Sequence, residues 1–194
     1  QTGIAVQVQG DYLYGAPAAG NRLLGVAQFE RNKNPLAQKL PGFEFGDSNE
    51  DSQKKRVELE ERTLNDAGHA DIDIDLGPAS GKRSPYTVRA TLSLLESGGR
   101  PVIRSIERTL WPAPVLVGIR PLFIGDYARE GSMAQFEVVR SDSEARLFAA
   151  KALPVRLFRE NRDYYWRFDD QRGWHSGFAE TDELVATASV VVPA

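Results

Sequence analysis

Three aspartates at alternating positions are the strongest candidate for metal chemistry in the sequence. Asp71, Asp73 and Asp75 occur in the stretch DIDIDLG, and carboxylates two residues apart can converge on one hard cation at the start of a calcium-binding loop. Such a loop also requires a glycine and a bidentate glutamate where this chain has Leu76 and Lys82. The isoleucines between the aspartates favour a half-buried strand with a solvent-exposed acidic face. We therefore expect no metal site and no cofactor.

The two histidines are the only candidates for the base of a Ser-His-Asp triad. His69 occurs in NDAGHADI and His175 in QRGWHSGF, and neither lies near a G-x-S-x-G nucleophile elbow. We expect both to be solvent-exposed turn residues, and we expect the protein to be no enzyme. The chain contains no cysteine. This excludes thiol catalysis, a thiolate metal site and a disulfide framework, but it does not fix the cell compartment.

An aromatic cluster in residues 161–178, NRDYYWRFDDQRGWHSGF, is the best candidate for a binding platform. Tryptophan and tyrosine offer flat apolar faces to a sugar or peptide, and arginine can stack on them. Alternation places Tyr164, Trp166 and Phe168 on one face of a strand and Tyr165 and Arg167 on the other. A structural hairpin with one face in the core and the other partly exposed is the favoured interpretation.

Several other ligand classes are disfavoured. Gly15, Gly20 and Gly25 lack both a G-x-G-x-x-G pattern and a following Lys-Ser/Thr, so they are expected at turns and bends rather than around a phosphate. The net charge is −3 and the basic residues are dispersed, which does not favour nucleic acid. No apolar run approaches the roughly 18 residues that span a bilayer. The opening QTGIAVQVQG shows no targeting signal.

The elements that must position these residues are predicted to be β-strands, because apolar and polar residues alternate along most of the chain. Turn sequences at 65–68, 77–78, 97–101 and 169–173 separate the runs, which favours antiparallel hairpins in a sandwich. Two segments, 52–64 and 141–152, contain good helix formers without an apolar stripe, and the first is predicted to be a strand. The alternating runs are Ile4, Val6 and Val8; Ile72, Ile74 and Leu76; Tyr86, Val88, Ala90, Leu92 and Leu94; Val155 and Leu157; Tyr164, Trp166 and Phe168; Val190 and Val192.

A proline-rich stretch, LWPAP at 110–114, predicts a stiff connector between two domains, because proline cannot donate a ladder hydrogen bond and holds the chain extended. We expect a first β-sandwich domain at 1–112 and a second at 113–194. One long loop, at 30–55, is polar but contains Leu36, Leu40, Phe43 and Phe45. We expect those side chains to pack against the first sandwich, while a disordered or cleavable tip runs free.

Several motifs follow one another in the order of a known family. The opening VQVQGDYLYGAPAAGNR fits a strand-corner-strand pattern, Y-x-Y-G-x-P-x-x-G. PGFEFG at 41–46, DAGHADI at 66–72, SGGRPV at 97–102 and VGIRP at 117–121 follow, and then the YYW hairpin. Together these stretches resemble the macroglobulin-like (MG) domains of bacterial alpha-2-macroglobulins. The pattern positions of the opening are filled by Tyr12, Tyr14, Gly15, Pro17 and Gly20.

The resemblance implies two seven-stranded antiparallel sandwiches of the immunoglobulin or fibronectin sort, in a long exported protein of the bacterial periplasm. Membrane anchoring through a distant part of the parent is left open. The resemblance also implies inhibition of proteases by entrapment after cleavage of a bait segment. Many members of the family carry a C-x-E-Q thioester, which this cysteine-free chain lacks. The partners implied are other domains of the same chain and target proteases. By composition, the tip of the 30–55 loop is the only bait candidate.

Two other functions compete with this structural role. The first is a ligand-binding module of an adhesin or cell-envelope protein, in which Tyr165, Arg167 and Trp174 would contact a glycan or peptide. The second, less favoured, is a metal-dependent hydrolase that uses the three aspartates. On the leading interpretation Tyr12, Tyr14 and Pro17 set the geometry of a sandwich corner, and function is distributed over a larger assembly.

Overall fold

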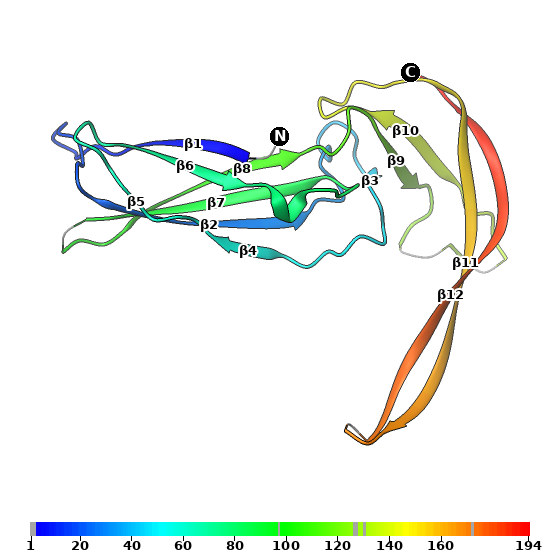
Figure 1. Cartoon of the computed structure of the whole chain (residues 1–194). Coiled ribbons are helices and arrows are strands. Elements are labelled where there is room, and N and C mark those ends of the chain that lie inside the picture. Colours follow the sequence, from blue (N-terminus) through cyan, green and yellow to red (C-terminus); the bar gives the residue numbers. More distant parts are fainter. Residues whose placement is uncertain (1–2, 97, 126–127, 130, 172) are drawn as a thin grey trace. The chain divides into compact units, whose positions relative to one another are not determined.

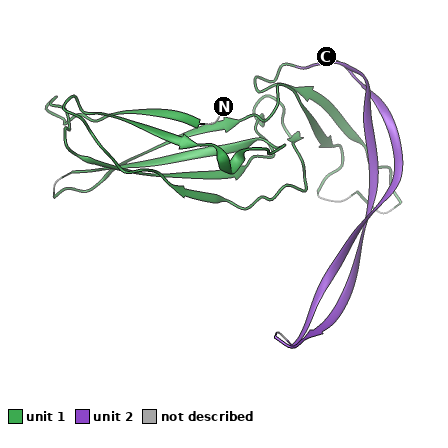
Figure 2. Ribbon diagram, in the orientation of Figure 1, with its two compact units in different colours: residues 1–146 green, residues 147–194 purple. Residues whose placement is uncertain are grey.

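The computed structural model describes residues 3–96, 98–125, 128–129, 131–171 and 173–194. They form two compact units, 1–146 and 147–194, which Figure 2 distinguishes by colour. Apart from one 3-10 turn, the regular structure of the described residues consists of antiparallel strands, which confirms the all-β prediction. The elements are β1 (Gly3–Gln9), β2 (Arg22–Arg31), β3 (Glu44–Phe45), β4 (Lys55–Glu58), β5 (Arg62–Thr63), β6 (His69–Asp75), η1 (Gly77–Ala79), β7 (Tyr86–Leu95), β8 (Val102–Leu110), β9 (Leu116–Pro121), β10 (Phe136–Ser141), β11 (Ala150–Asp169) and β12 (Gly173–Val192).

The first unit contains a sandwich of two unequal layers (Figure 1). One layer is the pair β1–β6, and the other has the order β4–β2–β7–β8, with β5 also paired to β2. Alternation determines which side of each strand faces inward. In β6, Ile72 and Ile74 are buried, whereas the aspartates on either side of them are exposed. The segment at 52–64 forms β4 and β5, as predicted.

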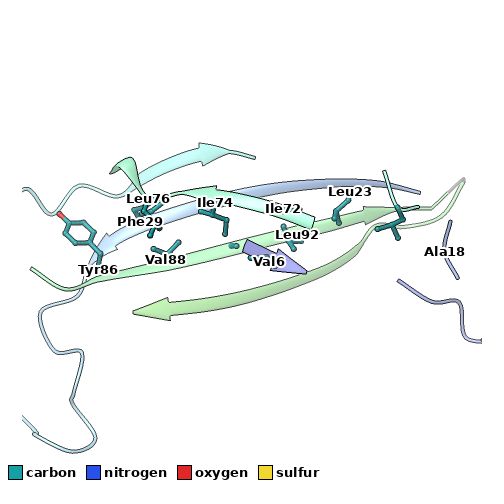
Figure 3. Packing of buried hydrophobic residues seen from close by; sticks show 13 residues of the cluster. Val6, Ala18, Leu23, Phe29, Ile72, Ile74, Leu76, Tyr86, Val88 and Leu92 are labelled. Atoms are coloured by element: carbon teal, nitrogen blue, oxygen red, sulfur yellow. The ribbon is translucent and has the colours of Figure 1, made fainter. Parts of the chain in front are cut away.

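The sandwich core lies between these two layers (Figure 3). Phe29, Leu23, Ile72 and Ile74 are no more than 2% exposed, and full burial of such side chains stabilises the fold by about 1.5–3 kcal/mol each. The buried members of the cluster are Val6, Ala18, Leu23, Ala27, Phe29, Leu64, Ile72, Ile74, Leu76, Tyr86, Val88, Ala90 and Leu92.

Gly25 corrects one prediction, because it lies inside strand β2 and not at a turn. A Cβ at this position would lie 2.8 Å from Cδ2 of Leu92 and 2.9 Å from Cδ1 of Leu59. The missing side chain therefore makes room for two leucines. Gly15 and Gly20 do lie in the corner between β1 and β2, with φ angles of 86° and 75°, which glycine adopts without strain.

A second cluster surrounds a three-stranded sheet of order β10–β9–β3. Phe43 and Phe45 are buried there, and they pack with Trp111, Leu116 and Val139. The expectation that the 30–55 loop packs against the first sandwich is therefore wrong for these side chains, because β3 pairs with β9 instead. Leu36 and Leu40 belong to the same cluster.

The proline-rich stretch connects the two clusters of the first unit. Leu110 packs against the sandwich core, while its neighbour Trp111 packs against the second cluster, with its ring centroid 5.6 Å from that of Phe45. Consecutive side chains are thus held by different cores. Pro112 and Pro114 follow at the start of the next segment, before β9 begins.

The tip of the 30–55 loop does not run free, contrary to expectation. The two carboxylate oxygens of Glu50 accept hydrogen bonds from the backbone N–H groups of Arg83 and Ser84, at 2.6 and 2.9 Å. The Asp47 N–H donates to Oγ of Ser84 at 2.9 Å. Charged acceptors make such bonds about twice as strong as neutral ones. The carboxylate of Glu50 and the backbone N–H of Asp47 thus anchor the tip to the segment before β7.

The second unit is a hairpin of two long strands, β11 and β12. Its turn is the predicted one between Asp169 and Gly173; Arg172 within it, and Ser97 in the turn between β7 and β8, lie outside the described residues. The prediction that one aromatic face is buried is wrong for the described residues, since Tyr164, Trp166 and Phe168 are all more than half exposed. The segment at 141–152 runs from the end of β10 to the start of β11 without a helix.

Candidate functional site

The aspartates of β6 do not converge on one point. Asp71, Asp73 and Asp75 are all exposed on one face of the strand, where same-face residues are about 6.5–7 Å apart. Asp75 Oδ1 accepts a hydrogen bond from the Gly77 N–H at 3.0 Å. Among the residues that the structure describes, no group of three or more histidine, aspartate or glutamate side chains could hold a metal ion.

The histidines lie in strands, which corrects their predicted place in turns. His69 is the first residue of β6, and its N–H donates to Oδ1 of Asn65 at 2.9 Å. His175 belongs to β12, where Nδ1 lies 3.3 Å from the Gly173 carbonyl oxygen and 3.4 Å from Oδ2 of Asp169. The two residues belong to different units. The backbone of His69 and the ring of His175 each have a polar partner in the turn next to them.

The corner between β1 and β2 is held by its tyrosines. The rings of Tyr12 and Tyr14 stack with centroids 5.3 Å apart and planes 3° apart. The Tyr12 hydroxyl accepts a hydrogen bond from Nδ2 of Asn21 at 2.9 Å, and Asp11 and Pro17 form a β-bridge across the corner. Tyr12 also packs against the sandwich core. These contacts support the architectural role that was expected of the motif.

Arg120 is an interaction centre that the sequence analysis missed. Its guanidinium carbon lies 4.6 Å from the centre of the Phe43 ring. Nε donates to Oε2 of Glu137 at 2.8 Å, and one terminal nitrogen donates to the Pro41 carbonyl oxygen at 3.0 Å. The motifs PGFEFG and VGIRP both stand out in the sequence, and strand pairing of Glu44 and Phe45 with β9 brings them together.

The hairpin presents an aromatic face, which we define as Tyr164, Trp166, Phe168, Trp174 and Phe178. Cross-strand register places Tyr164 opposite Phe178 and Phe168 opposite Trp174, and opposite residues share a face. Both pairs of rings are in contact, with centroids 5.3 and 5.5 Å apart. The five side chains are nevertheless 54–70% exposed.

Tyr165 lies on the other face of the hairpin, where it covers Gly177. A Cβ at Gly177 would lie 2.8 Å from the Tyr165 hydroxyl oxygen. Arg167 pairs with His175 on this same face. The three residues proposed as a glycan or peptide site are therefore divided, because Tyr165 and Arg167 share one face and Trp174 belongs to the other.

Large exposed aromatic faces are typical of sites that bind another protein, a membrane or a ligand, and tryptophan and tyrosine are enriched at protein interfaces. No helix among the described residues has the length and apolarity needed to cross a membrane. The fold defines a class: an all-β protein of antiparallel sandwich-type domains.

Comparison with known proteins gives the family. The model of the bacterial alpha-2-macroglobulin MG5 domain matches residues 1–112, and that of bacterial macroglobulin domain 6 matches residues 118–194. Alpha-2-macroglobulin of Escherichia coli (strain K12) is 40% identical over 193 residues, and that of Xylella fastidiosa (strain Temecula1) is 42% identical over 180 residues. The match covers 92% of this chain in both cases. The chain belongs to the bacterial alpha-2-macroglobulin family.

Solved structures agree with this assignment. Escherichia coli alpha-2-macroglobulin activated by porcine elastase matches with a TM-score of 0.84 and 39% identity, over 99% of this chain and 17% of that one. The native conformation of the Escherichia coli protein matches with a TM-score of 0.79 and 36% identity, over 98% of this chain and 13% of that one. The chain spans only 12% of the length of its Escherichia coli K12 relative and 11% of the Xylella one.

Proposed function

We propose that this chain is a structural part of a protease-trapping inhibitor, in which two macroglobulin-like domains, 1–112 and 113–194, hold the geometry of a larger assembly. The observation that carries the proposal is the consecutive match of an MG5 and an MG6 domain along nearly the whole chain. The Escherichia coli relative, which one solved structure holds in a form activated by elastase and another in a form activated by trypsin, adds support.

The mechanism we propose is mechanical. Proteases cleave a bait segment of the parent, the modules rearrange, and the protease is enclosed. In this chain Leu110 and Trp111 tie the sandwich to the next sheet, and Arg120 ties β9 to the loop at Pro41. Such ties transmit a displacement because packed interiors resist deformation. The domains contribute no catalytic group, and the parent acts in the periplasm.

The bait segment is proposed to lie outside the 30–55 loop. Proteases require an extended, accessible segment, and exposed loop tips are cut most readily. Here Glu50 and Asp47 anchor the tip to Arg83 and Ser84. These hydrogen bonds, which we call the Glu50 clasp, reduce the population of the extended form of the loop. The loop is therefore a poor protease substrate.

Protease trapping by the full-length parent tests the proposal. After incubation with elastase, the parent is expected to block cleavage of a large protein substrate while leaving cleavage of a small chromogenic peptide largely intact, because the enclosed active site still admits small molecules. The isolated 194-residue chain is expected to block neither reaction. A parent that leaves cleavage of the large substrate untouched contradicts the function. Saturable glycan binding by the isolated chain would favour the adhesin alternative instead.

A further inference from the structure

The sandwich of the first unit has an open side between β1 and β8. A groove of about 330 Å³ opens there. Its lining comes from both layers and includes Ile4 and Val6 of β1, Val88 and Ala90 of β7, and Ile106 of β8. The smaller layer, β1–β6, is too narrow to cover the whole of the larger one, which ends in β8.

The inward face of β8 continues the buried face of β7. Register places Ile106 opposite Ala90 and Val102 opposite Leu94, so their side chains point to the core side of the sheet. Ala90 is 1% exposed, but Ile106 and Val102 are 47% and 41% exposed. The apolar surface of this layer therefore extends past the strands that cover it.

The edge of β1 offers a place for the missing cover. Among the described residues β1 pairs with β6 alone, which leaves one edge of its backbone available for another strand. A strand added there would lie about 4.8 Å beyond β1 and about 10 Å from β8, the spacing of packed sheets. One strand would then pair with β1 and cover Ile106 at once.

The charged side chains of β8 indicate which side chains the added strand carries. Arg104 and Arg108 flank Ile106 on the inward face of β8, and among the described residues neither forms an ion pair, although one terminal nitrogen of Arg104 donates a hydrogen bond to the Ile103 carbonyl oxygen at 2.9 Å. Glu107, on the opposite face, is already paired with Arg89. A complementary strand places acidic side chains beside Arg104 and Arg108 and apolar side chains on Ile106 and Val102.

We propose that the edge of β1 binds a further β-strand from another segment of the same polypeptide, and that the side chains on its inward face, at every second residue, are in turn apolar and acidic. We assign the strand to the same polypeptide because the Escherichia coli relative is matched over only 12% of its sequence, which leaves most of that relative outside the matched region. A tethered segment reaches the groove at a high effective concentration, which a separate molecule lacks. The inference does not depend on protease inhibition.

Hydrogen exchange of the unmodified proteins is the first test. In the 194-residue chain, β1 amides that point away from β6 are expected to exchange quickly, whereas in the full-length parent they are expected to be protected by about tenfold or more. Equal exchange in the two proteins overturns the proposal. Protection of the outer edge of β8 in place of β1 also overturns it, because such a strand would extend the other layer.

Cysteine labelling is the second test, and the absence of native cysteine in this segment makes it specific. Ile106→Cys and Ile103→Cys lie on opposite faces of β8, and both native side chains are about half exposed in this structure. With maleimide labelling followed at the peptide level, Ile106→Cys is expected to react quickly in the 194-residue chain and slowly in the parent. Ile103→Cys, the matched control, is expected to react quickly in both. Protection of Ile106→Cys that rises with the concentration of the 194-residue chain would identify a second copy as the occupant and overturn the same-chain source.

Discussion

Gly118 lies directly opposite Phe45 in the β3–β9 ladder, and a Cβ on Gly118 would lie 2.6 Å from Cε1 of the Phe45 ring. Real side chains do not approach so closely, so the absence of a side chain at 118 permits the ring to cover β9. Phe45 is only 1% exposed as a result. The contact fixes the buried end of the 30–55 loop.

Gly118→Val is therefore expected to lower the free energy of unfolding by about 1–3 kcal/mol, the usual effect of overpacking a tight core. The backbone at Gly118 is not in the left-handed region, so the effect comes from the contact with Phe45 and not from backbone strain. Urea denaturation measures it. Ile119→Val, next to it on the exposed face, is the control, and it should change stability by no more than about 0.5 kcal/mol. Equal effects of the two substitutions would contradict the packing argument.

Arg120→Ala is expected to destabilise the chain by about 1–3 kcal/mol, because it removes hydrogen bonds to Pro41 and Glu137 and the contact with the Phe43 ring. Arg120→Lys should recover only part of this loss, since an ammonium group cannot reproduce the planar fork. Arg62→Ala, which removes a surface ion pair with Glu60, should cost at most about 1 kcal/mol. Full rescue by lysine would show that charge alone matters here.

Glu50 is expected to make stability depend on pH. Burial acts to raise the pKa of Glu50, but hydrogen bonds from Ser84 and from the Arg83 N–H, with the charge of Lys82, outweigh it, so the pKa lies below its ordinary value of 4.5. A lowered pKa in the folded state gives stabilisation that is present above pH 4.5 and is lost as the pH falls through the folded value.

Glu50→Gln should therefore lower the urea midpoint at neutral pH, and the gap from the unmodified chain should narrow well below pH 4.5. Glu58→Gln, at an exposed carboxylate beside Arg56, serves as the matched control and should show a much smaller gap at every pH. A gap for Glu50→Gln that is constant with pH would show that the carboxylate charge does not hold the loop tip.

Tryptophan fluorescence should separate the partly buried Trp111 from the exposed tryptophans of the hairpin. The double variant Trp166→Phe/Trp174→Phe retains Trp111 alone, and it should emit at shorter wavelength and resist acrylamide quenching. Trp111→Phe retains the two tryptophans of the aromatic face, which should emit at longer wavelength and be quenched readily. Quenching of the two variants to the same extent would contradict the exposure of the hairpin.

Calcium is expected to leave the melting temperature unchanged, because Asp71, Asp73 and Asp75 point in the same direction without converging. A bound ion at about 100 times its dissociation constant would stabilise the fold by about 2.7 kcal/mol. Scans with calcium and with a chelator measure the effect. An increase in melting temperature with calcium that Asp73→Asn abolishes would show that these aspartates do bind a metal ion.

Strands β6 and β7 of the first sandwich could be predicted from sequence because one face of each is buried. Ile72 and Ile74 alternate with aspartates, and this alternation is typical of a strand with one face in a core and the other in solvent. The destination of Phe43 and Phe45 could not be predicted, since the alternation in β9 does not reveal its partner. Exposure of the aromatic face could not be predicted either, because Tyr164 and Trp166 show the same alternation whether or not another surface covers them.

The Glu50 clasp and the Arg120 contacts were beyond sequence analysis for a different reason. Each joins a side chain to backbone groups in a distant segment, and no periodicity records such a bond. Family resemblance was more informative at the corner, where Tyr12 and Pro17 occupy a motif whose geometry the structure supports. The division of the chain at residues 112 and 113 stays a prediction.

Leu110 and Trp111 are adjacent in the chain, yet they pack against different clusters. A force applied across this point cannot extract one side chain while sparing the other, and consecutive residues on an extended chain leave no slack to absorb the movement. The junction is therefore expected to be a rigid connection and not a hinge, so that a displacement of either sheet also displaces the other.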